Sequence, residues 1–180
     1  VCRANNIYMY MDGARLGSAL TAEGNDIAFT DLTGLLDAFY IGGTKNGFLM
    51  GEALVIVNPA LKEDFRFMIK QRGGMFAKGR LIGIQFEEMF RDNLYFDLAA
   101  ETNAYAGKLR EGIREKGYSF MVESPSNQIF PLFTPEKVRE LEKKYFFYPY
   151  LPLDNGLVPI RLVCSWATTQ EDVDSFLQVL

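Results

Sequence analysis

Two charged side chains of this sequence stand where buried strands are expected to end, and as a pair they are able to do chemistry. Asp12 follows the apolar run at residues 7–11, and Lys45 follows the run at 38–41 inside a glycine-rich loop. Ligands of open α/β sheets gather at the carboxyl ends of the strands, so both side chains are expected to point into one crevice. Singly, each residue also suits an ordinary turn or loop tip, so the hypothesis depends on their combination.

A carboxylate and a lysine amine held together suit one cofactor, pyridoxal 5′-phosphate (PLP). The lysine amine forms a Schiff base with the PLP aldehyde, and the aspartate keeps the pyridine nitrogen protonated, so that the ring accepts electrons from the substrate. The glycines around Lys45 let a ligand approach the backbone closely. The pair therefore predicts a PLP site in which Asp12 and Lys45 are the catalytic residues.

The composition excludes several other classes of site. The sequence has no histidine and two isolated cysteines, Cys2 and Cys164, so this chain cannot form a Ser-His-Asp triad, a His-ligated metal site or a Cys₄ cluster, and we predict no metal. Two lone thiols favour a reducing compartment, and we expect a cytoplasmic protein.

The charge and hydropathy patterns argue against two kinds of partner. The net charge is −4 and no basic tract is present, which argues against nucleic acid and anionic membranes. No apolar run approaches the roughly 20 residues of a membrane span, and no signal peptide is visible. We therefore expect no nucleic acid and no membrane as partners.

The predicted elements divide the chain into two parts. A third strand at 52–57 follows the second too soon for a parallel crossover, so these two strands are expected to be antiparallel. A long helix at 95–116, ended by Gly117, is expected to connect the parts. The remaining predicted elements are helices at 16–20, 30–36, 59–72 and 77–90, strands at 118–122, 127–133, 146–150 and 158–164, and two capped helices that begin after Thr134 and Thr169.

Three short segments resemble a known family. The runs YMDGARL at 10–16, IGGTKNG at 41–47 and KQRGG at 70–74 are similar to the low-specificity threonine aldolase and β-eliminating lyase family of fold-type-I PLP enzymes. The similarity covers nearly the whole chain, but it matches only the C-terminal half of such an enzyme.

The resemblance implies the fold class and the domains. The fold is expected to be α/β: the C-terminal part of a fold-type-I PLP-dependent transferase-like large domain, with a mostly parallel sheet and one antiparallel strand, plus a small α+β C-terminal domain. Residues 1–93 are expected to belong to the large domain, 94–117 to a connecting helix, and 118–180 to the small domain.

The resemblance also implies roles for five residues. Asp12 pairs with the pyridinium, Lys45 is the Schiff-base lysine, and Thr44 replaces the usual serine beside it as a cofactor-binding hydroxyl. Arg15 lies beside the cofactor or the substrate carboxylate, and Arg161 matches the arginine that binds that carboxylate. A planar guanidinium suits a carboxylate bidentately, although Arg161 also fits an edge strand with its side chain reaching water.

Four further residues have weaker assignments. Lys78 and Arg80 either add positive charge near the PLP phosphate or begin a solvated helix. Asn127 suits a turn cap, and Trp166 suits a core or an interface. The chain also departs from the family, with Asn46 in place of a common glycine and residues 163–167 in place of a Thr-His segment, and these departures leave the substrate open.

The predicted function is that of a lyase which cleaves a β-hydroxy-α-amino acid, such as threonine, into glycine and an aldehyde. The alternatives are β-elimination or another PLP reaction on an amino acid and, from a different class, a non-catalytic remnant or structural subunit of the same fold. The expected partners are a small amino-acid substrate and further copies of the chain in a dimer or tetramer with the active site at a subunit interface. We also expect an N-terminal half, absent from this sequence, to supply the phosphate-binding loop.

Overall fold

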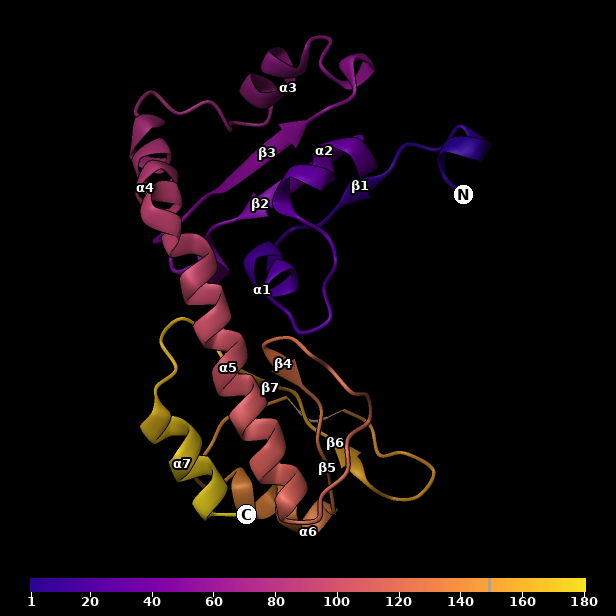
Figure 1. The fold of residues 1–180 in the computed structure, drawn as a ribbon, viewed down its shortest axis with the longest axis vertical. Helices are drawn as coiled ribbons and strands as arrows, with labels where there is room; N and C mark the ends of the chain where they lie inside the picture. The colour runs from indigo at the N-terminus through magenta and orange to yellow at the C-terminus, as the bar shows by residue number, and fades with distance from the viewer. Residues whose placement is uncertain (149) are drawn as a thin grey trace. The chain divides into compact units, whose positions relative to one another are not determined.

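The computed structural model describes residues 1–148 and 150–180, and Pro149 lies outside the described residues. The chain forms two compact units, whose elements are labelled in Figure 1. Unit 1 contains residues 1–20 and 25–97, and unit 2 contains residues 21–24 and 98–180. The assignment of 1–93, 94–117 and 118–180 as domains stays a prediction.

A three-stranded sheet forms the centre of unit 1. Its strands are β1 (Tyr10–Met11), β2 (Ala38–Gly42) and β3 (Glu52–Ile56), in that order. Strand β1 pairs with β2 in parallel, and β3 pairs with β2 in the antiparallel sense. The predicted antiparallel pair is therefore confirmed, and β2 is the central strand, with four of its five residues buried.

The first strand differs from the prediction of a buried strand at 7–11. Only Tyr10–Met11 pairs with β2, and the apolar side chains of residues 7–10 are 47–60% exposed. Residues 7–9 lie outside β1, and within the described residues β1 has a neighbouring strand on one side alone.

The helices of unit 1 follow the sequence signals with one interruption. The predicted helix at 59–72 is divided into a 3₁₀ turn at Pro59–Leu61 and α3 (Phe65–Gln71), because Asp64 between them has a left-handed backbone with φ of 53°. The others are α1 (Leu16–Leu20), α2 (Leu32–Leu35) and α4 (Arg80–Phe90), with further 3₁₀ turns at Arg3–Asn5, Phe29–Asp31, Thr44–Asn46 and Arg91–Asn93. Of the long helix α5 (Leu94–Glu115), residues 94–97 belong to unit 1 and the rest to unit 2.

An aromatic cluster packs beneath the end of β2. The Phe48 ring lies 4.6 Å from that of Phe86, and the Phe90 ring stacks on Tyr95 at 4.9 Å between centroids. Tyr95 is fully buried, and its hydroxyl donates to the Gly42 carbonyl at 3.2 Å. This one side chain therefore anchors the strand end that leads into the Lys45 loop.

Unit 2 contains two short antiparallel pairs. Strand β4 (Gln128–Ile129) pairs with β7 (Leu162–Val163), and β5 (Leu132–Phe133) pairs with β6 (Val158–Pro159). The predicted strands at 127–133 and 158–164 are thus each divided in two. The predicted strand at 118–122 is a single bridge at Phe120, and residues 146–148 and 150 form no strand.

The helices of unit 2 begin where their caps predict. The Thr134 side chain accepts from the Lys137 backbone N–H at the start of α6 (Pro135–Leu141), which ends before the predicted residue 145. Thr169 and Asp172 form the predicted capping box of α7 (Gln170–Gln178). The core of unit 2 packs on α5, whose Leu109 and Ile113 are buried, and Gly117 ends that helix with φ of 85°.

Candidate functional site

The turn after β1 presents an aspartate with one engaged oxygen. Oδ1 of Asp12 accepts from the Ala14 backbone N–H at 3.0 Å and from the Tyr40 hydroxyl. The hydrogen bond from Tyr40 has the largest effect and lowers the pKa of Asp12, and the bond from Ala14 also lowers it. The positive charges of Lys45 and Arg15 lower the pKa further. Asp12 is therefore an anion whose Oδ2 accepts no hydrogen bond from any residue that the structure describes.

The loop after β2 presents the lysine to solvent. Thr44 and Lys45 lie on the 3₁₀ turn Thr44–Asn46, both exposed, and Gly47 closes the turn with φ of 102°. Within residues 1–148 and 150–180, neither the Thr44 hydroxyl nor the Lys45 amine has a hydrogen bond or ion pair. Lys45 is thus an accessible amine beside Asp12, close enough for its charge to act on that carboxylate.

Two hydrogen bonds join the aspartate turn to the lysine loop, and a third fixes the Asn46 side chain within the lysine loop. The Gly42 backbone N–H donates to the Gly13 carbonyl at 2.9 Å. The side-chain amide of Asn46, which is 5% exposed, donates to the carbonyls of Gly42 at 2.7 Å and Ala14 at 3.2 Å. The structure therefore brings Asp12, Arg15, Thr44 and Lys45 together. Asn46, which the sequence marked only as a departure from the family pattern, helps to hold the two loops.

The glycines of these loops have a role that the sequence analysis did not assign. A Cβ atom on Gly13 would lie 1.7 Å from the Tyr40 carbonyl oxygen, and one on Gly42 would lie 2.5 Å from the Ala14 carbonyl oxygen. The prediction assigned the glycines near Lys45 to close approach of a ligand. In the structure Gly42 allows the two loops to pack backbone against backbone. Close approach of a ligand near Lys45 stays a prediction.

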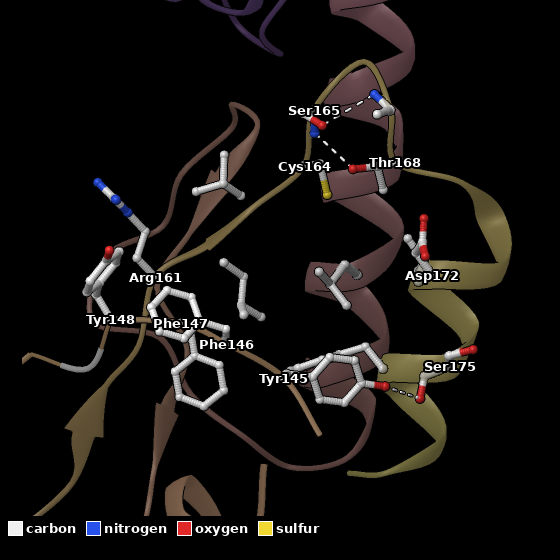
Figure 2. Close-up of a pocket in the computed structure, with 16 residues that line it drawn as sticks. Tyr145, Phe146, Phe147, Tyr148, Arg161, Cys164, Ser165, Thr168, Asp172 and Ser175 are labelled. Carbon is white, nitrogen blue, oxygen red and sulfur yellow. Dashed lines mark hydrogen bonds between the residues drawn. The ribbon is translucent and has the colours of Figure 1, made fainter. Parts of the chain in front are cut away.

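Arg161 lies in unit 2, in the connection between β6 and β7, and lines a cavity of about 520 Å³. Tyr148, Phe146 and Phe147 line the same cavity, as Figure 2 shows. Arg161 is half-buried and makes no ion pair or hydrogen bond within the described part of the chain. Its role toward a substrate carboxylate stays a prediction.

The four weaker candidates have mixed surroundings. Asn127 is buried and its amide donates to the Cys164 carbonyl at 2.8 Å, so it links two strand ends instead of capping a turn. Trp166 is 53% exposed and therefore is not part of the core of this chain. Lys78 and Arg80 are exposed at the start of α4, and their role toward a phosphate stays a prediction.

Among the residues that the structure describes, no helix is long and apolar enough to cross a membrane. No three His, Cys, Asp or Glu side chains among them group in a way that would hold a metal ion.

Comparisons of sequence identify relatives of known activity. No protein-family model matches the chain. The low-specificity L-threonine aldolases of Pseudomonas aeruginosa and of a second Pseudomonas strain are each 29% identical to it over 174 residues, which is 96% of this chain and 49% of each relative. The chain thus spans about half the length of the curated relatives that it matches.

Comparisons of structure give the same picture. A threonine aldolase of Leishmania major is 43% identical, with a TM-score of 0.94 over 99% of this chain and 52% of its own. A putative aromatic amino acid β-eliminating lyase/threonine aldolase from Exiguobacterium sp. (19% identity, TM-score 0.70, 99% of this chain and 53% of that one) shares the fold. So does the serine palmitoyltransferase of Sphingomonas wittichii (16% identity, TM-score 0.69, 99% and 47%).

These findings confirm the predicted fold class, that of the C-terminal part of a fold-type-I PLP-dependent enzyme, and they confirm the resemblance inferred from the DGAR and glycine-lysine segments. Over its length the chain is similar to the C-terminal half of the low-specificity threonine aldolases.

Proposed function

We propose that the protein to which this chain belongs is a PLP-dependent carbon–carbon lyase that cleaves a β-hydroxy-α-amino acid, such as threonine, into glycine and an aldehyde. One observation carries the proposal. An ionised Asp12 with a free oxygen lies beside the accessible amine of Lys45, on loops that hydrogen bonds join, in a chain 43% identical to a threonine aldolase.

The residues of unit 1 fit PLP. Its pyridinium N–H needs an anionic acceptor, and Oδ2 of Asp12 is one. Its aldehyde needs an accessible amine, and the Lys45 amine has no competing partner within the described residues. When bound, PLP supplies an electron sink for the bond that breaks at the substrate Cα.

Each side chain then has a distinct task. Lys45 would hold the cofactor covalently, and Asp12 would keep the proton on the ring nitrogen. Thr44 and Arg15, on the same two loops, would bind the cofactor, with Arg15 also able to meet the substrate carboxylate. Arg161 would orient that carboxylate with its two-pronged guanidinium, so that the scissile bond is aligned for cleavage.

The proposal includes partners and a location. Residues outside this chain, in an N-terminal half, would complete the site and bind the PLP phosphate. The chain's coverage of 49% of its curated relatives supports this. We further propose a homo-oligomer, a dimer or tetramer with the active site at a subunit interface. A cytoplasmic location is supported by the two free cysteines, Cys2 and Cys164.

The second candidate reaction is β-elimination, which the same Asp12 and Lys45 would serve. It is favoured by residues 163–167, where the sequence departs from the threonine aldolase pattern next to Arg161. Incubation of the natural full-length protein with threonine and with serine separates the two reactions. Glycine and an aldehyde support the aldolase, pyruvate or another 2-oxo acid with ammonia supports elimination, and a colourless protein without turnover supports a non-catalytic subunit.

The cofactor lysine can be mapped directly. Borohydride reduction of the PLP-loaded full-length protein should fix a pyridoxyl group on Lys45, because Lys45 is the lysine beside Asp12. Peptide mass spectrometry locates the adduct, and Lys45→Ala serves as the negative control. An adduct on Lys70 or Lys78 in the wild-type protein would show that the assignment is wrong.

A further inference from the structure

The Tyr40 hydroxyl is a side-chain partner of Asp12 that the sequence analysis did not single out. Tyr40 lies in the middle of β2, half-buried, and its hydroxyl donates to Oδ1 of Asp12 across the parallel β1–β2 pair. The Ala14 backbone N–H donates to the same oxygen at 3.0 Å. Two donors on Oδ1 restrict rotation of the carboxylate and leave Oδ2 without a hydrogen-bond donor among the described residues.

The backbone around this contact is held firmly. A Cβ atom on Gly13 would lie 1.7 Å from the Tyr40 carbonyl oxygen, so the turn that carries Asp12 packs directly on the backbone of Tyr40. The Tyr40 hydroxyl also stays protonated, because the bond to Asp12 and burial raise the pKa of Tyr40 to about 12. It is therefore a constant donor from neutral to moderately alkaline pH.

We propose that Tyr40 is a positioning residue that holds Oδ2 of Asp12 toward the pyridine nitrogen of the cofactor. The inference rests on the proposed function, since it concerns the same Asp12, and adds a residue that acts through it. Donation to Oδ1 makes the carboxylate a weaker base, so the shared proton stays on the ring nitrogen and not on Asp12.

The test observes that proton without relying on turnover. The natural full-length protein is loaded with PLP labelled with nitrogen-15 in its ring, and the nitrogen chemical shift reports whether the ring is protonated. In Tyr40→Phe, Oδ2 is less well aimed and the carboxylate is more basic. Both changes move the signal toward that of neutral pyridine. We also expect kcat to fall about tenfold, the size of one lost hydrogen bond to a charged group, with little change in KM.

The matched control is Tyr10→Phe. The Tyr10 ring is the neighbour of Tyr40, with 6.4 Å between centroids, and within the described residues its hydroxyl makes no hydrogen bond to Asp12. This variant should leave the nitrogen signal unchanged, while circular dichroism confirms that both variants are folded.

Two results would overturn the inference, and they differ in what else they affect. An unchanged nitrogen signal in Tyr40→Phe, together with a shifted signal in Asp12→Asn, refutes the role of Tyr40 and retains the proposed function. An unchanged signal in both variants refutes the contact between Asp12 and the ring, and with it the site assignment on which both proposals depend.

Discussion

At the scale of single residues, Asp12 and Arg161 have different environments, which suit the different tasks proposed for them. Asp12 is held by two donors and by nearby positive charge, which is the environment of a carboxylate that must stay ionised. Arg161 is half-buried and its guanidinium has no hydrogen bond or ion pair within the described residues, so it is able to take up the carboxylate that we propose for it. The environment of Asp12 suits its proposed role of keeping the cofactor ring protonated, and that of Arg161 suits its proposed role of binding a carboxylate.

Kinetics should separate these tasks. Asp12→Asn removes the anion that keeps the ring nitrogen protonated, so we expect kcat to fall by orders of magnitude while PLP stays bound. Arg161→Lys replaces a two-bond fork with a point charge, so we expect mainly a higher KM. Steady-state kinetics and the absorbance of bound PLP measure both effects, with Asp26→Asn in an exposed loop as the control. If kcat falls and KM rises in the same proportions in both variants, this division of roles is contradicted.

At the scale of elements, the site depends on two loops that touch backbone to backbone. Gly13 and Gly42 leave no room for a side chain, and Asn46 bridges the loops from a buried position. The relative position of the loops that carry Asp12 and Lys45 is therefore set by main-chain contacts. Such contacts are stiffer than contacts between long exposed side chains.

A pair of glycine variants tests the importance of this packing. Gly13→Ala places a methyl group 1.7 Å from a backbone oxygen, so the turn must move, and we expect a loss of about 2–4 kcal/mol in the free energy of unfolding. Gly34→Ala in α2 meets no atom within 4 Å, so we expect no loss, or a gain of about 0.5–1 kcal/mol from helix propensity. Urea unfolding of both variants measures the difference. A Gly13→Ala variant as stable as Gly34→Ala would show that the loops are not tightly packed.

At the scale of the whole molecule, apolar surface gathers at the first strand. The side chains of residues 7–10 are about half exposed, and β1 has an open edge within the described residues. Apolar surface of this kind combined with an open strand edge promotes association. The proposed N-terminal half or a second copy of the chain would cover it.

The 180-residue chain, prepared by itself, should consequently self-associate and bind PLP weakly. Sedimentation velocity should show oligomers, which Ile7→Lys with Tyr8→Lys should reduce because charge is added to the exposed apolar run. Ala100→Lys with Ala104→Lys, on exposed positions of α5, adds the same charge elsewhere and should change nothing. A monomer that is cooperatively folded and saturable with PLP would refute the expectation of a missing half.

The sequence by itself determined the features that depend on neighbours along the chain. The sequence predicted the helix caps at Thr134 and Thr169, the helix end at Gly117 and the antiparallel pairing of β3 with β2. Each of these features depends on residues a few positions apart. The fold class followed from three short segments that resemble a family. The proposal that Asp12 and Lys45 are the catalytic pair came from the ends of two apolar runs.

Only the tertiary structure decided how the site is held. Tyr40 reaches Asp12 and Asn46 reaches Ala14 across elements about thirty positions apart in sequence, and no local pattern encodes such a contact. The exposure of residues 7–10 was likewise mispredicted, since an apolar run does not reveal whether a strand lies in the middle of a sheet or at its edge. Hydrogen bonds and burial between distant segments are set when the chain packs, and therefore they appear only in three dimensions.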